Sequence, residues 1–180
     1  KPLDDADFFP IFQRMTEHDL PIWLHPVRTS AWPDYPALDH SKFAAFFTFG
    51  WPYETSLAMT HLVFAGIFEK LPGIKIITHH MGAMIPFFEG RVGVGFDEFT
   101  EHSPDLELSA ARAGLTRPPA DYYKMFYADT ALFGAAAGTR CGVDYFGADQ
   151  NLFGSDAPFG RGGSNNGDTI RPIAGTAVTA

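Results

Sequence analysis

The feature that most constrains the fold of this chain is an alternation of short apolar runs with helical segments. Four runs have the length and composition of buried strands, at 21–25, 74–80, 125–129 and 151–156. Helical patterns lie before and between them, at 7–19, 54–70, 118–124 and 131–145. Strands and helices that alternate in this way form parallel sheets joined by right-handed crossovers. The sequence therefore predicts an α/β fold with a parallel sheet.

Metal-ligating side chains lie at the ends of these predicted strands. His25, His80, Asp129 and Asp156 each end one of the four runs. The carboxyl ends of parallel strands share one edge of the sheet, so His25, His80 and Asp156 are expected to converge there. Imidazole and carboxylate are ligands that a zinc-like ion accepts, with one position left for water or substrate. The pattern predicts a divalent-metal site, although each residue alone is more often structural.

Other residues near these strand ends have weaker or alternative interpretations. His79 would point opposite to His80 in an extended strand, which favours packing between sheet and helix. Asp129 is equally compatible with anchoring a ligand and with capping a turn. The proline-rich segment 26–37 is expected to form an active-site loop, and Trp32 within it is a candidate for binding the substrate.

Charge and composition exclude several classes of partner. The net charge is −8, and no cluster of lysine and arginine could neutralise several phosphates, so nucleic acid is not expected. No apolar run approaches the roughly 20 residues of a membrane helix, so a membrane is not an expected partner. The single cysteine, Cys141, excludes an internal disulfide and favours a reducing compartment, so we expect a cytoplasmic protein.

Several motifs resemble those of a known enzyme family. They are Ile22-Trp-Leu-His-Pro26, Thr78-His-His-Met-Gly82, Ile85-Pro-Phe-Phe-Glu-Gly-Arg91 and Leu152-Phe-Gly-Ser-Asp-Ala-Pro158. In order and spacing they are similar to the second half of the amidohydrolase-related family, which includes aminocarboxymuconate semialdehyde decarboxylase and γ-resorcylate decarboxylase. The resemblance implies a (β/α)8 TIM barrel, which needs about 250 residues. We therefore expect an incomplete barrel, its C-terminal half, over 1–160 and a flexible or irregular tail over 161–180.

The resemblance also implies roles for individual residues. His25 and Asp156 correspond to metal ligands, and His80 to a catalytic residue beside the metal-bound water or substrate. Asp156 would in addition shuttle a proton. Arg91 corresponds to an arginine that binds a substrate carboxylate in a neighbouring subunit, which implies a homodimer or a higher homo-oligomer. Zinc is the expected ion, with manganese as the alternative.

Three functional hypotheses follow from these patterns. The first is a metal-dependent decarboxylase of a small aromatic or unsaturated carboxylic acid. The second directs the same metal site at a lactone, ester or amide, which makes the protein a hydrolase. The third is an inactive barrel fragment, because the His-x-His or Glu-x-His pair on the family's first strand does not occur in this sequence.

Overall fold

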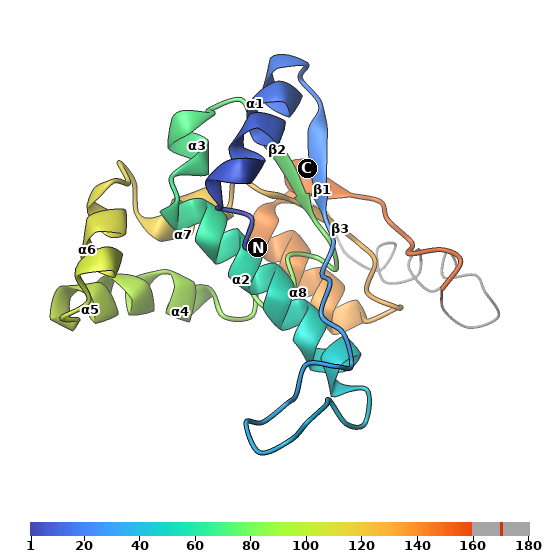
Figure 1. Cartoon of the computed structure of the whole chain (residues 1–180). Helices are drawn as coiled ribbons and strands as arrows, with labels where there is room; N and C mark the ends of the chain where they lie inside the picture. The colour runs from blue at the N-terminus through green and yellow to red at the C-terminus, as the bar shows by residue number, and fades with distance from the viewer. Residues whose placement is uncertain (160–169, 171–180) are drawn as a thin grey trace.

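The chain forms a four-stranded parallel sheet whose strands follow one another in sequence order (Figure 1). The computed structural model describes residues 1–159 and 170. The strands are β1 (Pro21–Leu24), β2 (Lys75–Thr78), β3 (Tyr127–Asp129) and β4 (Asn151–Leu152). Each pairs in parallel with the next along the chain, as consecutive strands of a (β/α)8 barrel do. The predicted α/β fold with a parallel sheet is confirmed.

The crossovers between the strands are helical. The predicted helical segments overlap α1 (Phe9–Glu17), α2 (Trp51–Phe64), α3 (Ile67–Lys70), α7 (Pro119–Tyr123) and α8 (Ala136–Phe146). Short turns of other helix types are η1 (Ala6–Phe8), the π-helical η2 (Phe46–Gly50) and η3 (Ala148–Gln150). Segment 26–37 is a loop without regular structure, as predicted.

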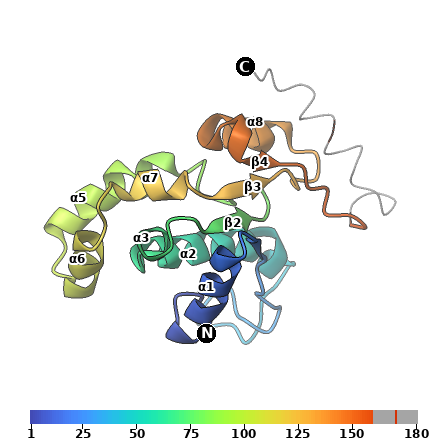
Figure 2. The same ribbon diagram turned by 90° about the horizontal axis from the view of Figure 1, so that it is seen from above.

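Three helices that the sequence analysis did not predict precede α7 in the crossover from β2 to β3. They are α4 (Glu89–Val92), α5 (Val94–His102) and α6 (Leu106–Ala113). Figure 2 shows α5 and α6 beyond α7, at the end farthest from the strands. Neither α5 nor α6 has a buried residue, although the partly buried Phe96 of α5 packs against the core. Asp105 nevertheless caps α6 by accepting hydrogen bonds from the amides of Glu107 and Leu108.

Several predicted boundaries are wrong for local reasons. The expected helix over 54–70 is interrupted at Gly66, whose φ of 69° lies in the left-handed region. The strand expected over 74–80 ends at Thr78, and His80 has a φ of 55°. The strand expected over 151–156 ends at Leu152. Beyond it, the amide and the carbonyl of Gly154 form hydrogen bonds with the side-chain hydroxyl of Thr130 instead of with the backbone of β3. Asp156 therefore lies in a loop.

The core forms where the helices cover the sheet. Met59, Leu62 and Val63 are fully buried on one face of α2, at helical spacing. They belong to the same cluster of buried side chains as Ile76 of β2 and Tyr123 of α7. In Figure 2, α2 lies beside β2 and α8 beside β4. The tail predicted over 161–180 lies outside the described residues except for residue 170. Among the described residues, no helix has both the length and the apolarity to cross a membrane.

Gly142 of α8 provides a test of this packing. A Cβ at this position would lie 1.9 Å from Cγ of Met81, which is only 2% exposed and has no room to move. Gly142→Ala should therefore lower the free energy of unfolding by about 1–3 kcal/mol in chemical denaturation. The control Gly90→Ala, whose Cβ would meet nothing within 4 Å in α4, should leave stability unchanged or raise it by up to about 1 kcal/mol. Equal stability of the two variants would contradict the packing described.

Candidate metal centre

Titratable side chains converge at the carboxyl ends of the strands. His79 and His80 follow β2, and Asp156 lies in the loop after β4. One ligand atom from each of these three residues lies within 4.8 Å of the other two. Nε2 of His79 is 3.5 Å from Oδ1 of Asp156, and Nε2 of His80 is 3.9 Å from Oδ2. Ligands at about 2 Å from one ion lie roughly 3–4 Å apart, so this spacing suits a bound cation.

His25, which follows β1, borders the same cluster. Its ring centroid is 5.0 Å from that of His79. Its Nδ1 donates a hydrogen bond to the carbonyl of Pro26 at 2.7 Å, because a carbonyl can only accept. Nε2 of a neutral His25 is then the nitrogen with a free lone pair. The structure thus brings His25, His80 and Asp156 to one edge, but the compact group of described ligand atoms contains His79 instead of His25.

The prediction that His79 packs between sheet and helix is wrong. Its ring centroid is 3.8 Å from that of His80, and both imidazoles face Asp156. Alternation of side chains requires an extended backbone, whereas β2 ends at Thr78 and His80 has a left-handed φ of 55°. Both histidines are therefore free to turn to the same side. In the sequence, the signal for this arrangement is the pair of adjacent histidines followed by the turn at Met81-Gly82.

Asp129, the last residue of β3, is the buried anchor of the cluster. It is 0% exposed and accepts four hydrogen bonds, from His79 Nδ1 at 2.5 Å, Trp23 Nε1 at 3.2 Å, the amide of His80 at 2.9 Å and the amide of Ala131 at 3.1 Å. Burial raises the pKa of this carboxyl, but its hydrogen bonds and the charge of His79 outweigh burial and lower the pKa overall. Asp129 is therefore an ionised anchor for a histidine of the cluster.

The two histidines have pKa values shifted in opposite directions. Burial and the neighbouring charge of His79 lower the pKa of His80 to about 4, so His80 is neutral at pH 7. Burial also lowers the pKa of His79, but Asp129 and Asp156 more than reverse this and raise it. Nε2 of His79 is buried without a hydrogen-bond partner among the described residues. A buried polar atom rarely lacks a partner, and a cation between His79 and Asp156 would provide one, so the residues fit a metal.

The backbone at the cluster is held in unusual conformations. His80 and Asp156 have φ values of 55° and 56°, in the left-handed region that few residues other than glycine adopt. Such strained positions concentrate at functional sites. Gly154 lets the loop before Asp156 approach closely, because a Cβ there would lie 3.0 Å from Cβ of Asp129.

An aromatic pocket adjoins His80. It encloses about 250 Å³ and is lined by Phe47, Thr48, Trp51, Pro52, His80, Ala131, Leu132 and Phe133. The ring of Phe133 stacks over the imidazole of His80, with centroids 6.3 Å apart and planes 28° apart. Trp51 contacts the ring of His25 edge-on at 5.5 Å. Phe47 and Phe133 were not predicted as pocket residues because neither lies at a strand end.

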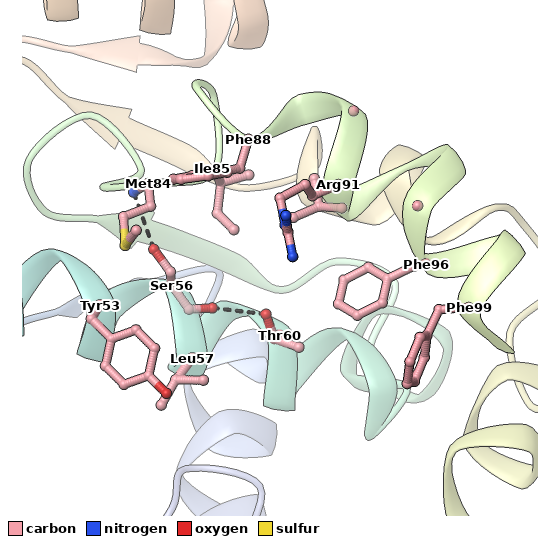
Figure 3. A pocket seen from close by; sticks show the side chains of 13 residues that line it. Tyr53, Ser56, Leu57, Thr60, Met84, Ile85, Phe88, Arg91, Phe96 and Phe99 are labelled. Atoms are coloured by element: carbon pink, nitrogen blue, oxygen red, sulfur yellow. Dashed lines mark hydrogen bonds between the residues drawn. The ribbon is translucent and has the colours of Figure 1, made fainter. Parts of the chain in front are cut away.

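The two predicted substrate-binding residues lie away from this pocket. Trp32 is 45% exposed and stacks with the guanidinium of Arg28 at 5.7 Å. Arg91 points from α4 into a separate cleft of about 650 Å³, whose opposite wall includes Ser56 and Thr60 of α2 (Figure 3). Within the described part of the chain, neither side chain lines the pocket beside His80. Their contacts with substrate remain predictions.

Comparison with known proteins identifies the family. The parallel sheet carries at its carboxyl edge a His–Asp group that could hold a metal ion, and the family described as Amidohydrolase matches residues 1–168. The chain belongs to this family, which confirms the resemblance found in the sequence. It is 30% identical to 2-amino-3-carboxymuconate-6-semialdehyde decarboxylase of Dictyostelium discoideum, with 96% of this chain and 44% of the relative covered. It is 27% identical to γ-resorcylate decarboxylase of Polaromonas sp., with 87% of the chain and 45% of the relative covered.

Solved structures support the barrel assignment. A dihydroxybenzoic acid decarboxylase from Polaromonas sp. JS666, with bound manganese and the inhibitor 2-nitroresorcinol, superposes with a TM-score of 0.75. The two sequences are 23% identical, and the match covers 99% of this chain and 50% of that one. The four parallel strands thus correspond to half of such a barrel, as predicted. The chain spans about half the length of the relatives it matches.

Proposed function

We propose that the protein containing this chain is a metal-dependent decarboxylase of a small aromatic carboxylic acid. The observation that carries the proposal is the position of the aromatic pocket, which shares His80 with the His79–His80–Asp156 cluster. The relatives named as decarboxylases support the same reaction. Because the chain spans about half their length, the proposal concerns the whole protein.

The proposed cation site uses His79, His80 and Asp156, with His25 at its border. Zinc accepts both imidazole and carboxylate ligands, and carboxylates also suit manganese. The manganese in the Polaromonas structure favours manganese, and the zinc expected from the sequence stays untested. When bound, a divalent ion would polarise a substrate oxygen as a Lewis acid.

His80 and Asp156 would manage the proton. His80 is neutral at pH 7, lines the pocket, and has Nε2 3.9 Å from Oδ2 of Asp156. His80 can therefore act as a general base that takes a proton from a substrate hydroxyl or a water, and Asp156 can shuttle that proton to the ring carbon that bears the carboxylate. The bond between that carbon and the carboxylate then breaks, its electron pair returns to the ring, and carbon dioxide leaves. The substrate ring would stack on Phe133, whose ring lies beside the imidazole of His80.

Arg91 is proposed to act in the active site of a second subunit. Its side chain is exposed and lies in a cleft that does not include the pocket beside His80. This separation supports the prediction that it binds the substrate carboxylate in a neighbouring subunit, as a bidentate pair, within a homodimer. Trp32 in the loop 26–37 stays a proposed substrate contact. The single cysteine continues to favour a cytoplasmic location.

Metal binding provides the first test. The purified protein should bind a divalent ion, measured by titration calorimetry with Mn²⁺ and with Zn²⁺. Asp156→Asn should weaken binding by roughly 10–100-fold or more, since loss of even an outer partner has that effect. The matched control Asp149→Asn changes an exposed acid of η3 and should bind as the unsubstituted protein does. Equal affinities for the two variants would refute the proposed site.

The reaction is tested by carbon dioxide release. We expect the full-length protein loaded with Mn²⁺ to release carbon dioxide from a small hydroxybenzoate such as 2,6-dihydroxybenzoate. A chelator should stop the release, and added Mn²⁺ should restore it. Hydrolysis of a lactone or ester without carbon dioxide would instead establish the hydrolase hypothesis. A metal-loaded protein without either activity would establish the inactive one.

Phe133 tests the aromatic pocket. Phe133→Ala removes a stacking partner, and such aromatic pairs contribute about 0.5–1.5 kcal/mol, so KM for the aromatic acid should rise about 2–10-fold. The control Phe43→Ala removes a phenyl ring that is 99% exposed and should leave KM unchanged. A KM that responds equally to both substitutions, or to neither, would show that the ring is not bound beside His80.

A further inference from the structure

We propose that Arg28 is a positioning residue that ties the proline-rich loop 26–37 to the start of α2 and so fixes the wall of the aromatic pocket formed by Trp51. The inference rests on the proposed function, because it concerns how the aromatic acid is held beside His80. No motif in the sequence marks Arg28, which lies in the loop that follows β1. Its role follows from contacts that only the folded chain brings together.

The guanidinium of Arg28 connects the loop to α2. Nη2 donates a hydrogen bond to the main-chain carbonyl of Pro33 in the loop at 3.1 Å, and Nη1 donates to Oε1 of Glu54 in α2 at 3.4 Å. The same group lies over the ring of Trp32, 5.7 Å from its centroid. The side chains of Arg28 and Glu54 are only 19% and 22% exposed. Salt screens such a partly buried pair much less than a surface pair, so it can hold the loop against α2.

The main chain of Arg28 holds the pocket wall directly. Its carbonyl accepts a hydrogen bond from the indole N–H of Trp51 at 2.8 Å. Trp51 lines the pocket beside His80 and contacts the ring of His25 edge-on, with centroids 5.5 Å apart. An indole has a single donor, so this bond determines which edge of the ring faces the loop. A shift of the backbone at Arg28 would therefore move the ring that lines the pocket.

Gly50, at the end of η2, leaves the space that the Arg28 side chain occupies. A Cβ at Gly50 would lie 2.4 Å from Cδ of Arg28 and 3.0 Å from its Nε. Gly50 has an ordinary helical φ of −66°, so its backbone conformation does not require glycine. The close approach of the Arg28 side chain does require it. Because Pro33 and Glu54 hold the far end of that side chain, it cannot move aside without breaking those bonds.

An alternative role for Arg28 is to bind the substrate carboxylate itself. Its guanidinium already bonds Pro33 and Glu54 and is covered by Trp32, which favours the positioning role. The two roles differ in whether lysine can replace arginine. An ammonium keeps the positive charge but lacks the planar fork that reaches two acceptors and stacks on an aromatic ring. Arg28→Lys should therefore retain carboxylate binding but lose the connection between loop and helix.

Steady-state kinetics of the full-length protein loaded with Mn²⁺ measures the effect on the pocket. Arg28→Ala and Arg28→Lys should each raise KM for 2,6-dihydroxybenzoate roughly 3–10-fold, since a hydrogen bond contributes about that factor. Both should keep kcat and Mn²⁺ affinity within about twofold, whereas a general loosening of the fold would lower these too. The control Arg14→Ala removes an exposed ion pair with Glu17 on α1 and should change none of the three.

Exchange of the Trp51 indole proton with solvent gives a readout that needs no substrate. In ¹⁵N-tryptophan NMR spectra of the full-length protein, the Trp51 signal is assigned by its absence from Trp51→Phe. Arg28→Ala should speed exchange of this proton roughly fivefold or more, because local opening governs exchange. The indole proton of Trp23, which is bonded to Asp129 at 3.2 Å, is the internal control and should keep its rate.

Gly50→Ala tests the same contact without removing a charge. Alone, it should displace the Arg28 side chain and speed Trp51 exchange about as much as Arg28→Ala does. Added to Arg28→Ala, it meets no side chain to displace and should change the rate by less than about twofold. Equal effects in both backgrounds would overturn the proposal. Should Arg28→Ala fail to fold, Gly50→Ala alone still decides, because an unchanged Trp51 exchange rate refutes the contact.

The outcomes separate this inference from the proposed function. If Arg28→Lys leaves KM unchanged, or if exchange at Trp51 does not respond to Arg28→Ala, the positioning role is refuted while the decarboxylase proposal stands. If the unsubstituted protein releases no carbon dioxide, the proposed function fails. The exchange rates then decide by themselves whether Arg28 holds Trp51 in place.

Discussion

A single buried negative charge organises the carboxyl edge of this sheet. Asp129 has no access to water, and a buried carboxylate without partners would cost several kcal/mol. Its four donors come from Trp23, His79, His80 and Ala131, which lie on or beside three successive strands. Satisfying this charge therefore sets how the strand ends meet. The unusual backbone at His80 is part of the arrangement, since the amide of that residue is one of the donors.

The short strands are the reason that chemistry can gather at this edge. Had β2 continued in extended form to His80, its last two side chains would have pointed to opposite faces of the sheet. Ending at Thr78 lets both imidazoles turn toward Asp156. The break in β4 acts similarly, because the hydroxyl of Thr130 bonds Gly154 and the loop then carries Asp156 back over the sheet. The site thus depends on where regular structure stops.

The sequence allowed the fold class and most of the cluster to be predicted, and the errors have physical causes. Apolar runs of fixed length are a local signal, so all four strands and their parallel order were predicted correctly. Strand ends were predicted too late, because hydrogen bonds made by Thr130 and Asp129 to distant residues determine them. The role of His79 was misjudged for the same reason. The helices α5 and α6 were missed; neither contains a buried residue, so neither forms part of the buried core that the apolar runs of the sequence define.

The central claim is that His79, His80 and Asp156 hold one cation between them. Anomalous diffraction from crystals of the zinc-loaded protein tests it directly. We expect one strong anomalous peak about 2.0–2.2 Å from Nε2 of His79 and from a carboxylate oxygen of Asp156. A peak coordinated by His25 and Asp156 without His79, or a peak elsewhere on the protein, would contradict it.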